Sequence, residues 1–265
     1  MTVQIIIPSF RAPEKLRRCL DCIERSNYRK FSLFVRDNSI DNVLFTAAVN
    51  EGILRGLRDS KTDYFLILNQ DCYISQDTLG KLVEAMERDS SYGIVSPVQL
   101  GEDGKVSWNG SLEAFPFGRH QKNAPLADAA VGCFETFWAN GACMMLRRAM
   151  VEEIGLLDRN LKFICSDSDY SFSARSRGWK VVVCQGTSVE HSLTTSGVVD
   201  GNRELERQKV ADALYFCNKW LSGDLYRSLS YEGPSLHRIY VAKVKRHLEE
   251  SVLRFGPPVG VDDSL

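Results

Sequence analysis

The stretch VQIIIPSFRAPEKLRRCLDCIERS, residues 3–26, contains the first strand and the first helix that the sequence predicts. The apolar run 3–7 predicts a buried strand that ends at Pro8. In the segment 13–26, Pro13 suits the first turn of a helix. The apolar side chains at helical spacing in that segment are Leu16, Cys19, Leu20 and Ile23.

The same alternation of strand and helix continues to residue 97. Further strands are predicted at 31–36, 63–68 and 92–97, with helices at about 43–58 and 77–89. Strands that alternate with helices imply right-handed crossovers and a mostly parallel sheet. We therefore expect an α/β fold, with a mostly parallel central sheet flanked by helices.

The rest of the chain is less regular. Gly, Pro and small residues at 101–132 indicate a hairpin and a long loop. The elements expected after it are a strand at 134–146, a short helix ended by Gly155, a helix from 166 to Gly178, and strands at 180–184 and 187–191. Residues 202–221 and 235–254 predict two helices outside the α/β alternation, and 256–265 predict a frayed end.

Composition limits the class of protein. The 265 residues include 33 Lys and Arg against 34 Asp and Glu, a net charge of -1 that gives no support to nucleic-acid binding. Eight cysteines are too few for a disulfide scaffold, and Cys19 and Cys22, one helical turn apart, are expected to be core thiols. The sequence has no secretory signal pattern and no apolar run of about 18 residues. We expect a cytoplasmic location.

Polar clusters follow three of the predicted strands. They are Ser9 to Arg11, Asp37 to Ser39 and Asn69 to Asp71. Ligands of such sheets bind beyond the carboxyl ends of the strands, so three clusters at one edge indicate a shared site. Asp71 there is suited to a hard divalent cation or to capping a helix, and both interpretations are open. Asp37 is suited to a self-bonded turn or to recognition of a base or ribose edge.

Two further places carry candidate catalytic groups. Asp167 and Asp169 open a predicted helix, where they could cap it and complement its dipole. A carboxylate at the lip of a cleft could equally be a general base, if burial raises its pKa. His191 ends the last core strand and is either structural or, if it lies near Asp71, a ligand of the same metal.

Missing motifs exclude other chemistry. The sequence contains no GxxxxGK[ST], no GxGxxG after the first strand, no HExxH and no GxSxG. These absences argue against P-loop, dinucleotide-binding, zincin and α/β-hydrolase enzymes.

The ordered set of motifs resembles glycosyltransferase family 2, and within it the bacterial rhamnosyltransferase-like branch most. The motifs are IIIPSFRAPEKLRRCLDCI, FVRDNS, NEG, DYFLILNQDCYI, WANGACMMLRRAMVEEIGLLD, SDSDYSFSARSRGWKVVV and EH. The resemblance covers about residues 3–191, and CNKW at 217–220 is similar to the tail of that branch.

The resemblance implies a GT-A fold, with a Rossmann-like nucleotide half and an acceptor half. It also implies a nucleotide-diphosphate sugar donor of the UDP or dTDP type, Mn²⁺ or Mg²⁺, and inversion at the anomeric carbon. The catalytic domain would be residues 1–200, and 201–265 would form a C-terminal helical extension with a frayed tail.

The resemblance also implies roles for single residues. Asp167 would be the general base, and Asp71 and His191 would hold the metal. The donor nucleotide would contact Pro8, Ser9, Phe10, Arg11, Asp37, Asn69 and Gln70. The sugar or acceptor would contact Trp138, Gly141, Ala142 and Asp169. The sequence departs from the family where Asn69, Gln70 and Ser166 replace acidic residues, which leaves one carboxylate in the metal motif.

Three hypotheses follow for the function. The first is an inverting, metal-assisted glycosyltransferase that acts on a hydroxyl of a glycan or lipid-linked glycan. The second is a nucleotide-sugar binding module that has lost catalysis, which the replacement of acidic residues by Asn69, Gln70 and Ser166 favours. The third is a sugar nucleotidyltransferase, which would normally carry a Gly-rich basic loop after the first strand.

The basic amphipathic segment 235–254 allows two interpretations. It could dock on the inner face of a membrane, or it could pack on the core or on a second copy of the chain as a homodimer.

Overall fold

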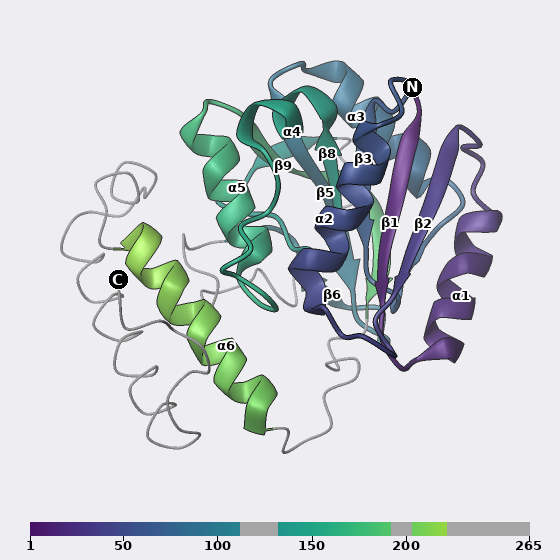
Figure 1. Cartoon of the computed structure of the whole chain (residues 1–265). Coiled ribbons are helices and arrows are strands. Elements are labelled where there is room, and N and C mark those ends of the chain that lie inside the picture. The colour runs from purple at the N-terminus through teal and green to yellow at the C-terminus, as the bar shows by residue number, and fades with distance from the viewer. Residues whose placement is uncertain (112–131, 192–202, 222–265) are drawn as a thin grey trace.

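The computed structural model describes residues 1–111, 132–191 and 203–221 (Figure 1). Within these residues, nine strands form one sheet, and its main path has the order β2-β1-β3-β8-β5-β9-β4. The path consists of β2 (Phe31–Asp37), β1 (Val3–Ser9), β3 (Tyr64–Leu68), β8 (Cys143–Arg147), β5 (Tyr92–Leu100), β9 (Lys180–His191) and β4 (Cys72–Ile74). Two strands lie off this path: β6 (Val106–Trp108) pairs with β5, and β7 (Cys133–Glu135) pairs with β9.

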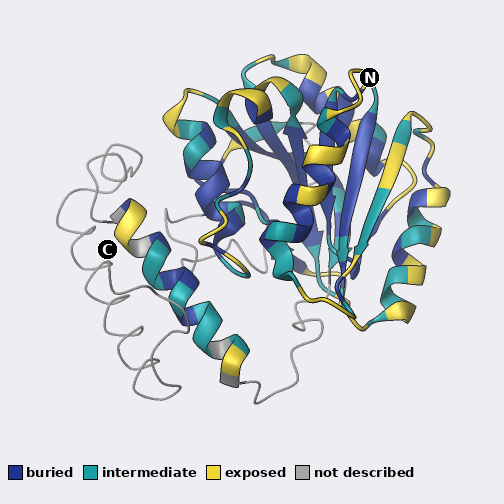
Figure 2. Ribbon diagram, in the orientation of Figure 1, coloured by how far each residue is buried: buried dark blue, intermediate teal, exposed yellow. Residues whose placement is uncertain are grey.

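The sheet is parallel from β2 to β3 and again between β5 and β9. β1 lies between β2 and β3 and pairs in parallel with both. β8 lies between β3 and β5 and is antiparallel to both, so the sheet is mixed where the two halves meet. Figure 2 shows β1 buried in the interior, whereas the edge strand β2 is partly exposed. The expected α/β fold is confirmed.

Helices cover both faces of the sheet. On one face, α1 (Pro13–Glu24) and α3 (Thr78–Arg88) share a hydrophobic cluster with Val3, Ile5 and Ile7, which are alternate residues of β1, and α3 packs against β5 and β9. On the other face, α2 (Leu44–Leu57), α4 (Arg148–Ile154) and α5 (Ser166–Ser176) pack around Ile6, Phe65 and Ile67. Because β1 and β3 are covered on both faces, their residues are mostly apolar, with Gln4 and Ser9 as the polar exceptions in β1.

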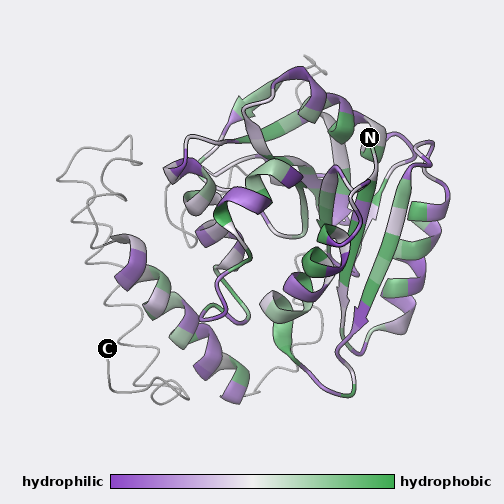
Figure 3. Cartoon of the chain, turned by 45° about the horizontal axis from the view of Figure 1, so that its top comes forward, coloured by the Kyte–Doolittle hydropathy of each residue, from purple (hydrophilic) through white to green (hydrophobic). Residues whose placement is uncertain are grey.

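α6 (Arg203–Phe216) and the π-helical turn η1 (Cys217–Leu221) lie beside α5, on its side away from the sheet (Figure 1). Ala213, Phe216 and Trp220 share a hydrophobic cluster with Phe172 of α5. Phe172 meets Trp220 edge-on, with ring centroids 5.4 Å apart. Hydrophobic and hydrophilic residues alternate along α1 and α6 (Figure 3), as in helices with one buried side. The helix expected at 202–221 is confirmed.

Several expected boundaries were wrong. β1 continues through Pro8 to Ser9, because β3 pairs with β1 only as far as Ile6 and needs no N–H from Pro8. The strand expected at 134–146 is two strands, β7 and β8, separated by a loop. The two short strands expected at 180–191 are the single strand β9, and the short strand β4 was not expected.

Some expectations fall outside the described residues. They include the long loop up to residue 131, the helix expected at 235–254 and the frayed end at 256–265. In the part of the chain that the structure describes, no helix has the length and apolar character needed to cross a bilayer.

Candidate functional site

Asp71 and His191 lie together, although 120 positions separate them in the chain. Asp71 immediately precedes β4, and β4 pairs antiparallel with β9 so that Cys72 lies opposite His191. This register places His191 Nε2 3.6 Å from Asp71 Oδ1. The Asp71 side chain is 1% exposed. The sheet thus brings together the two residues that the sequence nominated as metal ligands.

A third side chain orients the imidazole of His191. Its Nδ1 lies 3.2 Å from Oε1 of Gln99, a buried residue of β5. When Nδ1–H donates to this oxygen, the lone pair of Nε2 faces Asp71. Metal-binding histidines usually have such an outer partner.

The donor set fits a divalent cation that takes most of its ligands from elsewhere. Asp71 and His191 offer one carboxylate and one imidazole, and Mn²⁺ or Mg²⁺ bound by so few protein groups is completed by water and substrate phosphates. Among residues 1–111, 132–191 and 203–221, no cluster of three or more His, Cys, Asp or Glu side chains could hold a metal.

Asp167 lies in the first turn of α5, and its carboxylate is held from both sides. Oδ2 accepts the Gly141 N–H at 2.9 Å, and Oδ1 accepts the Ser168 N–H at 2.8 Å. Burial raises the pKa of Asp167 above its usual value, although these N–H groups oppose the shift. Asp167 as a whole residue is partly exposed.

The segment 140–142 connects Asp167 to the end of β3. The N–H of Asn69 donates to the Ala142 carbonyl at 2.9 Å, one residue from the contact between Gly141 and Asp167. The Asn140 side chain accepts the N–H of Ala142 at 2.9 Å and holds the turn that separates β7 from β8. Asp167 and the Asn69–Asp71 cluster therefore lie at the same edge of the sheet.

The Gln70 side chain bonds to the loop between β1 and α1, and its predicted contact with the donor nucleotide stays a prediction. Its Oε1 accepts the Ser9 hydroxyl at 2.9 Å and the Phe10 N–H at 3.0 Å, and its Nε2 donates to the Phe10 carbonyl at 3.0 Å. The buried carboxamide thereby fixes the loop between β1 and α1. Gln70 shapes the predicted nucleotide side through Ser9 and Phe10.

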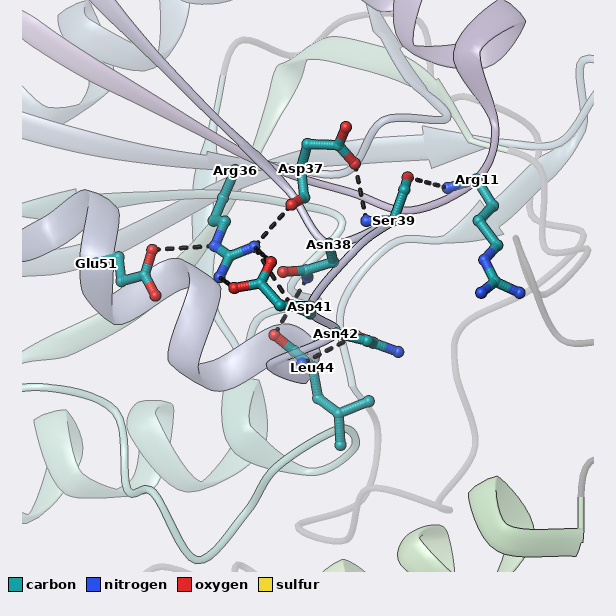
Figure 4. Close-up of polar contacts among 9 residues, drawn as sticks. All are labelled: Arg11, Arg36, Asp37, Asn38, Ser39, Asp41, Asn42, Leu44 and Glu51. Carbon is teal, nitrogen blue, oxygen red and sulfur yellow. Dashed lines mark hydrogen bonds and ion pairs between the residues drawn. The ribbon is translucent and has the colours of Figure 1, made fainter.

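The predicted nucleotide side also includes the loop after β2 (Figure 4). Asp37 is exposed, and the hydroxyl and N–H of Ser39 hold the pKa of its carboxyl below the usual range. Ser39 Oγ accepts the N–H of Arg11 at 3.1 Å, so this loop and the β1–α1 loop are joined. Arg36 forms a two-point ion pair with Asp41, with N–O distances of 2.8 and 2.9 Å.

The non-glycine residues with positive φ in the described ranges all border this region. Arg11 has a φ of 43°, Leu44 of 63° and Cys165 of 65°. Arg11 follows β1, Leu44 begins α2, and Cys165 precedes the helix that carries Asp167. Strained backbone of this kind is concentrated at functional sites, so its placement is a second indication of the site.

All four predicted sugar- or acceptor-binding residues, Trp138, Gly141, Ala142 and Asp169, are buried. Trp138 is 3% exposed, and it lies in the hydrophobic cluster of α5 and α6. Asp169 is 1% exposed, and its Oδ1 accepts Trp220 Nε1–H at 2.6 Å and pairs with Lys219 Nζ at 2.8 Å. Ligand contacts of these four residues stay predictions.

α6 anchors the segment before α5 through a residue that the sequence did not single out. The buried Asp212 accepts the N–H groups of Lys162, Phe163 and Ile164, at 3.1, 2.7 and 2.8 Å. Lys219 of η1 also pairs with Asp158 at 2.9 Å. α6 and η1 therefore hold both the approach to Asp167 and the helix that carries it.

Sequence reasoning did not single out four residues that contact the candidate site or the segment leading to it. They are Lys15, which lies beside Asp71, and Gln99, Asp212 and Lys219. Gln99 had a signal, because it is a polar residue inside an apolar strand. Lys15 had one also, because it lies in the first turn after β1, where the carboxyl ends of the strands meet. Asp212 and Lys219 contact residues that are distant in the sequence, so no local sequence pattern predicts their roles.

The comparisons with known proteins place this geometry in a family. The family model of glycosyltransferase-like family 2 matches residues 40–213. The amylovoran biosynthesis glycosyltransferase AmsB of Erwinia amylovora is 24% identical over 225 residues, which cover 74% of this chain and 72% of AmsB. The low-salt glycan biosynthesis hexosyltransferase Agl10 of Haloferax volcanii is 24% identical over 152 residues, 56% of this chain and 48% of Agl10.

A solved structure agrees on the fold. The crystal structure of GalNAc-T7 with UDP, GalNAc and Mn2+ superimposes with a TM-score of 0.64 at 12% identity. The match covers 96% of this chain and 57% of that one. The chain thus spans little more than half the length of GalNAc-T7, and its match to Agl10 spans about half of that protein. A likeness at this identity supports the fold, and the family model covers well over half of the sequence. The chain belongs to glycosyltransferase-like family 2.

Proposed function

We propose that the chain is an inverting glycosyltransferase that moves a sugar from a nucleotide-diphosphate donor to a hydroxyl of a glycan acceptor. The observation that carries the proposal is the 3.6 Å approach of His191 Nε2 to Asp71 Oδ1 at the carboxyl edge of the sheet. This pair offers a metal position where an α/β fold receives its ligand, and Asp167 is linked to the same edge.

Relatives support the substrate class. AmsB is named for amylovoran biosynthesis and Agl10 for low-salt glycan biosynthesis, and GalNAc-T7 was crystallised with UDP, GalNAc and Mn2+. We infer a UDP- or dTDP-type donor, with Mn²⁺ or Mg²⁺ held by Asp71 and His191. A hexose or deoxyhexose such as rhamnose as the transferred sugar, and a lipid-linked form of the acceptor, stay predictions. So do membrane contact and a homodimer, which concern residues 235–254.

In the proposed mechanism, the acceptor oxygen attacks the anomeric carbon as its proton passes to the carboxylate of Asp167. The bond between that carbon and the diphosphate oxygen breaks, and the nucleoside diphosphate leaves with the electron pair. A bound metal supplies charge neutralisation at the leaving oxygens. Gly141 and Ser168 hold the Asp167 carboxylate in place, and its raised pKa suits it to accept a proton.

The experiment is release of nucleoside diphosphate from UDP- and dTDP-sugars, with Mn²⁺ and a panel of glycan acceptors. Replacing a general base costs roughly 10²–10⁴-fold in rate, so Asp167→Asn should lose turnover by that factor while it retains donor binding. Asp21→Asn, an exposed change on α1, is the control and should leave turnover unaffected.

The pH dependence gives a second readout. Asp167 must be ionised to accept a proton, and burial raises its pKa, so kcat/KM should fall with decreasing pH at a point above the usual range of an aspartate. An acid limb at or below that range would contradict the assignment.

The same assay decides between the hypotheses. Tight donor binding without turnover with any acceptor would indicate a binding module. Two observations favour this alternative: the Gln70 side chain is bonded to Ser9, and position 166 is a serine. Release of pyrophosphate from a nucleoside triphosphate would indicate a nucleotidyltransferase.

A further inference from the structure

Lys15 lies at the other oxygen of the Asp71 carboxylate. Its Nζ is 3.6 Å from Asp71 Oδ2, whereas His191 approaches Oδ1. The Lys15 side chain is 35% exposed and Asp71 is 1% exposed, so the ammonium group reaches from the outside of the site toward a buried carboxylate. Lys15 belongs to the first turn of α1, directly after the loop that Gln70 holds.

The charges around Asp71 are less negative than a metal site with two or more carboxylates would have, so they favour binding of an anion. Asn69 and Gln70 contribute no carboxylate, and the Gln70 carboxamide is bonded to Ser9 and Phe10. Within the described residues, Asp71 is the carboxylate of this motif, and the ammonium of Lys15 offsets its charge. A second carboxylate would attract a cation, whereas an ammonium attracts phosphate oxygens, for which lysine is a common partner.

We propose that Lys15 binds the diphosphate of the donor directly and gives this site a diphosphate affinity that does not depend on a metal. The inference rests on the proposed function, because it assigns a residue to the donor site of that reaction. Lys15 can donate three hydrogen bonds, so it contacts a phosphate oxygen while it stays near Asp71.

A purely structural role would have a different signature. If Lys15 only neutralised the buried Asp71, its removal would lower thermal stability and leave diphosphate affinity as it was. If it binds the diphosphate, its removal weakens binding, and the loss is larger when no metal is present to hold the same phosphates.

The test measures binding of inorganic pyrophosphate, UDP and dTDP to the full chain by calorimetry, in EDTA and in Mn²⁺. The variants are Lys15→Gln, which keeps the chain length without charge, and Lys15→Arg, which restores the charge. Arg17→Ala is the matched control, because it removes a cation from the same helix whose partner is the exposed Glu14. Circular dichroism and melting temperatures verify that each variant folds.

The wild type is expected to bind all three probes in EDTA, and Lys15→Gln to weaken this binding roughly tenfold or more, as loss of a hydrogen bond to a charged group does. Arg17→Ala should match the wild type, and Lys15→Arg should recover much of the affinity. The loss in Lys15→Gln should be smaller in Mn²⁺.

Two outcomes would overturn the inference in different ways. Equal affinity of wild type and Lys15→Gln, or wild-type binding that requires Mn²⁺, removes the role of Lys15 and leaves the proposed function standing. If the wild type binds neither UDP, dTDP nor pyrophosphate in either buffer, the proposed donor site fails, and the inference fails with it.

Discussion

Gly141 and Asp167 approach each other more closely than most side chains would allow. A Cβ at position 141 would lie 3.1 Å from Asp167 Cβ, 3.3 Å from Asp167 Oδ2 and 3.5 Å from Phe45 Cζ. The Gly141 N–H also donates to that same carboxylate oxygen. Glycine at this position therefore permits the backbone to hold the candidate base directly.

The first prediction concerns Gly141→Ala. The added methyl should push the Asp167 carboxylate aside by a few tenths of an ångström, and misplacement on that scale should reduce kcat by roughly tenfold. The crowding should cost about 1 kcal/mol of folding free energy. Steady-state kinetics and urea unfolding measure the two effects.

Gly80→Ala is the control for this change. A Cβ at Gly80 in α3 would meet only Tyr28, at 4.0 Å, so alanine should be neutral or slightly stabilising there. If Gly141→Ala turned over at the wild-type rate, the contact between Gly141 and Asp167 would have no part in catalysis.

The sequence predicted the placement of single residues where those residues follow or end a strand. Asp71 follows an apolar strand, and His191 ends another, so their placement at one edge could be argued before their contact was known. The family resemblance implied an acceptor contact for Asp169, which stays a prediction. Its partners Trp220 and Lys219 could not be argued from the sequence, because they come from a segment about 50 residues away.

At the level of elements, α6 supports the candidate site through hydrogen bonds as well as through packing. Asp212 accepts three consecutive N–H groups at 162–164, and Gln208 donates to its Oδ1 at 2.8 Å. Without Asp212 these donors would lose their acceptor, in a loop that leads within a few residues to Asp167.

The second prediction is that Asp212→Ala destabilises the fold and slows turnover. Loss of a buried carboxylate that accepts several N–H groups should cost about 2–4 kcal/mol. The loop before α5 should loosen as a result, so kcat should fall more than donor affinity. Urea unfolding and donor titration measure these changes. Glu204→Ala, at an exposed position of α6, should alter neither, and a similar loss there would mean that the effect is not specific to the loop.

Elements whose apolar residues recur at a regular helical or strand spacing could be predicted. Elements whose bounds depend on contacts with distant segments could not. α1 and α3 have clear helical spacing of their apolar residues, and both are found where expected. The interruption between β7 and β8 was missed, because it depends on the bond of Asn140 to Ala142 and on the hold of Asp167 on Gly141. β4 was missed because three residues are too few to show alternation.

At the level of the whole molecule, the boundary predicted at residue 200 separates α6 from the catalytic part, and it stays a prediction. The contacts of α6 bear on how it can be tested. Val210, Phe216 and Trp220 are buried, and the last two pack on Phe172 of α5. A chain that ends at 200 would expose the apolar surface that these side chains cover and leave the loop at 162–164 without Asp212.

The third prediction therefore compares chains 1–200 and 1–223. Burial of a large apolar side chain is worth about 1.5–3 kcal/mol, so loss of three should cost on the order of 5 kcal/mol or more. This approaches the whole stability of many domains, about 5–15 kcal/mol. We expect 1–223 to unfold cooperatively in urea, and 1–200 to show a much lower midpoint or no cooperative transition. Equal midpoints would mean that residues 1–200 fold without α6, and that the bonds of Asp212 and Lys219 attach an extension to a domain that is already complete.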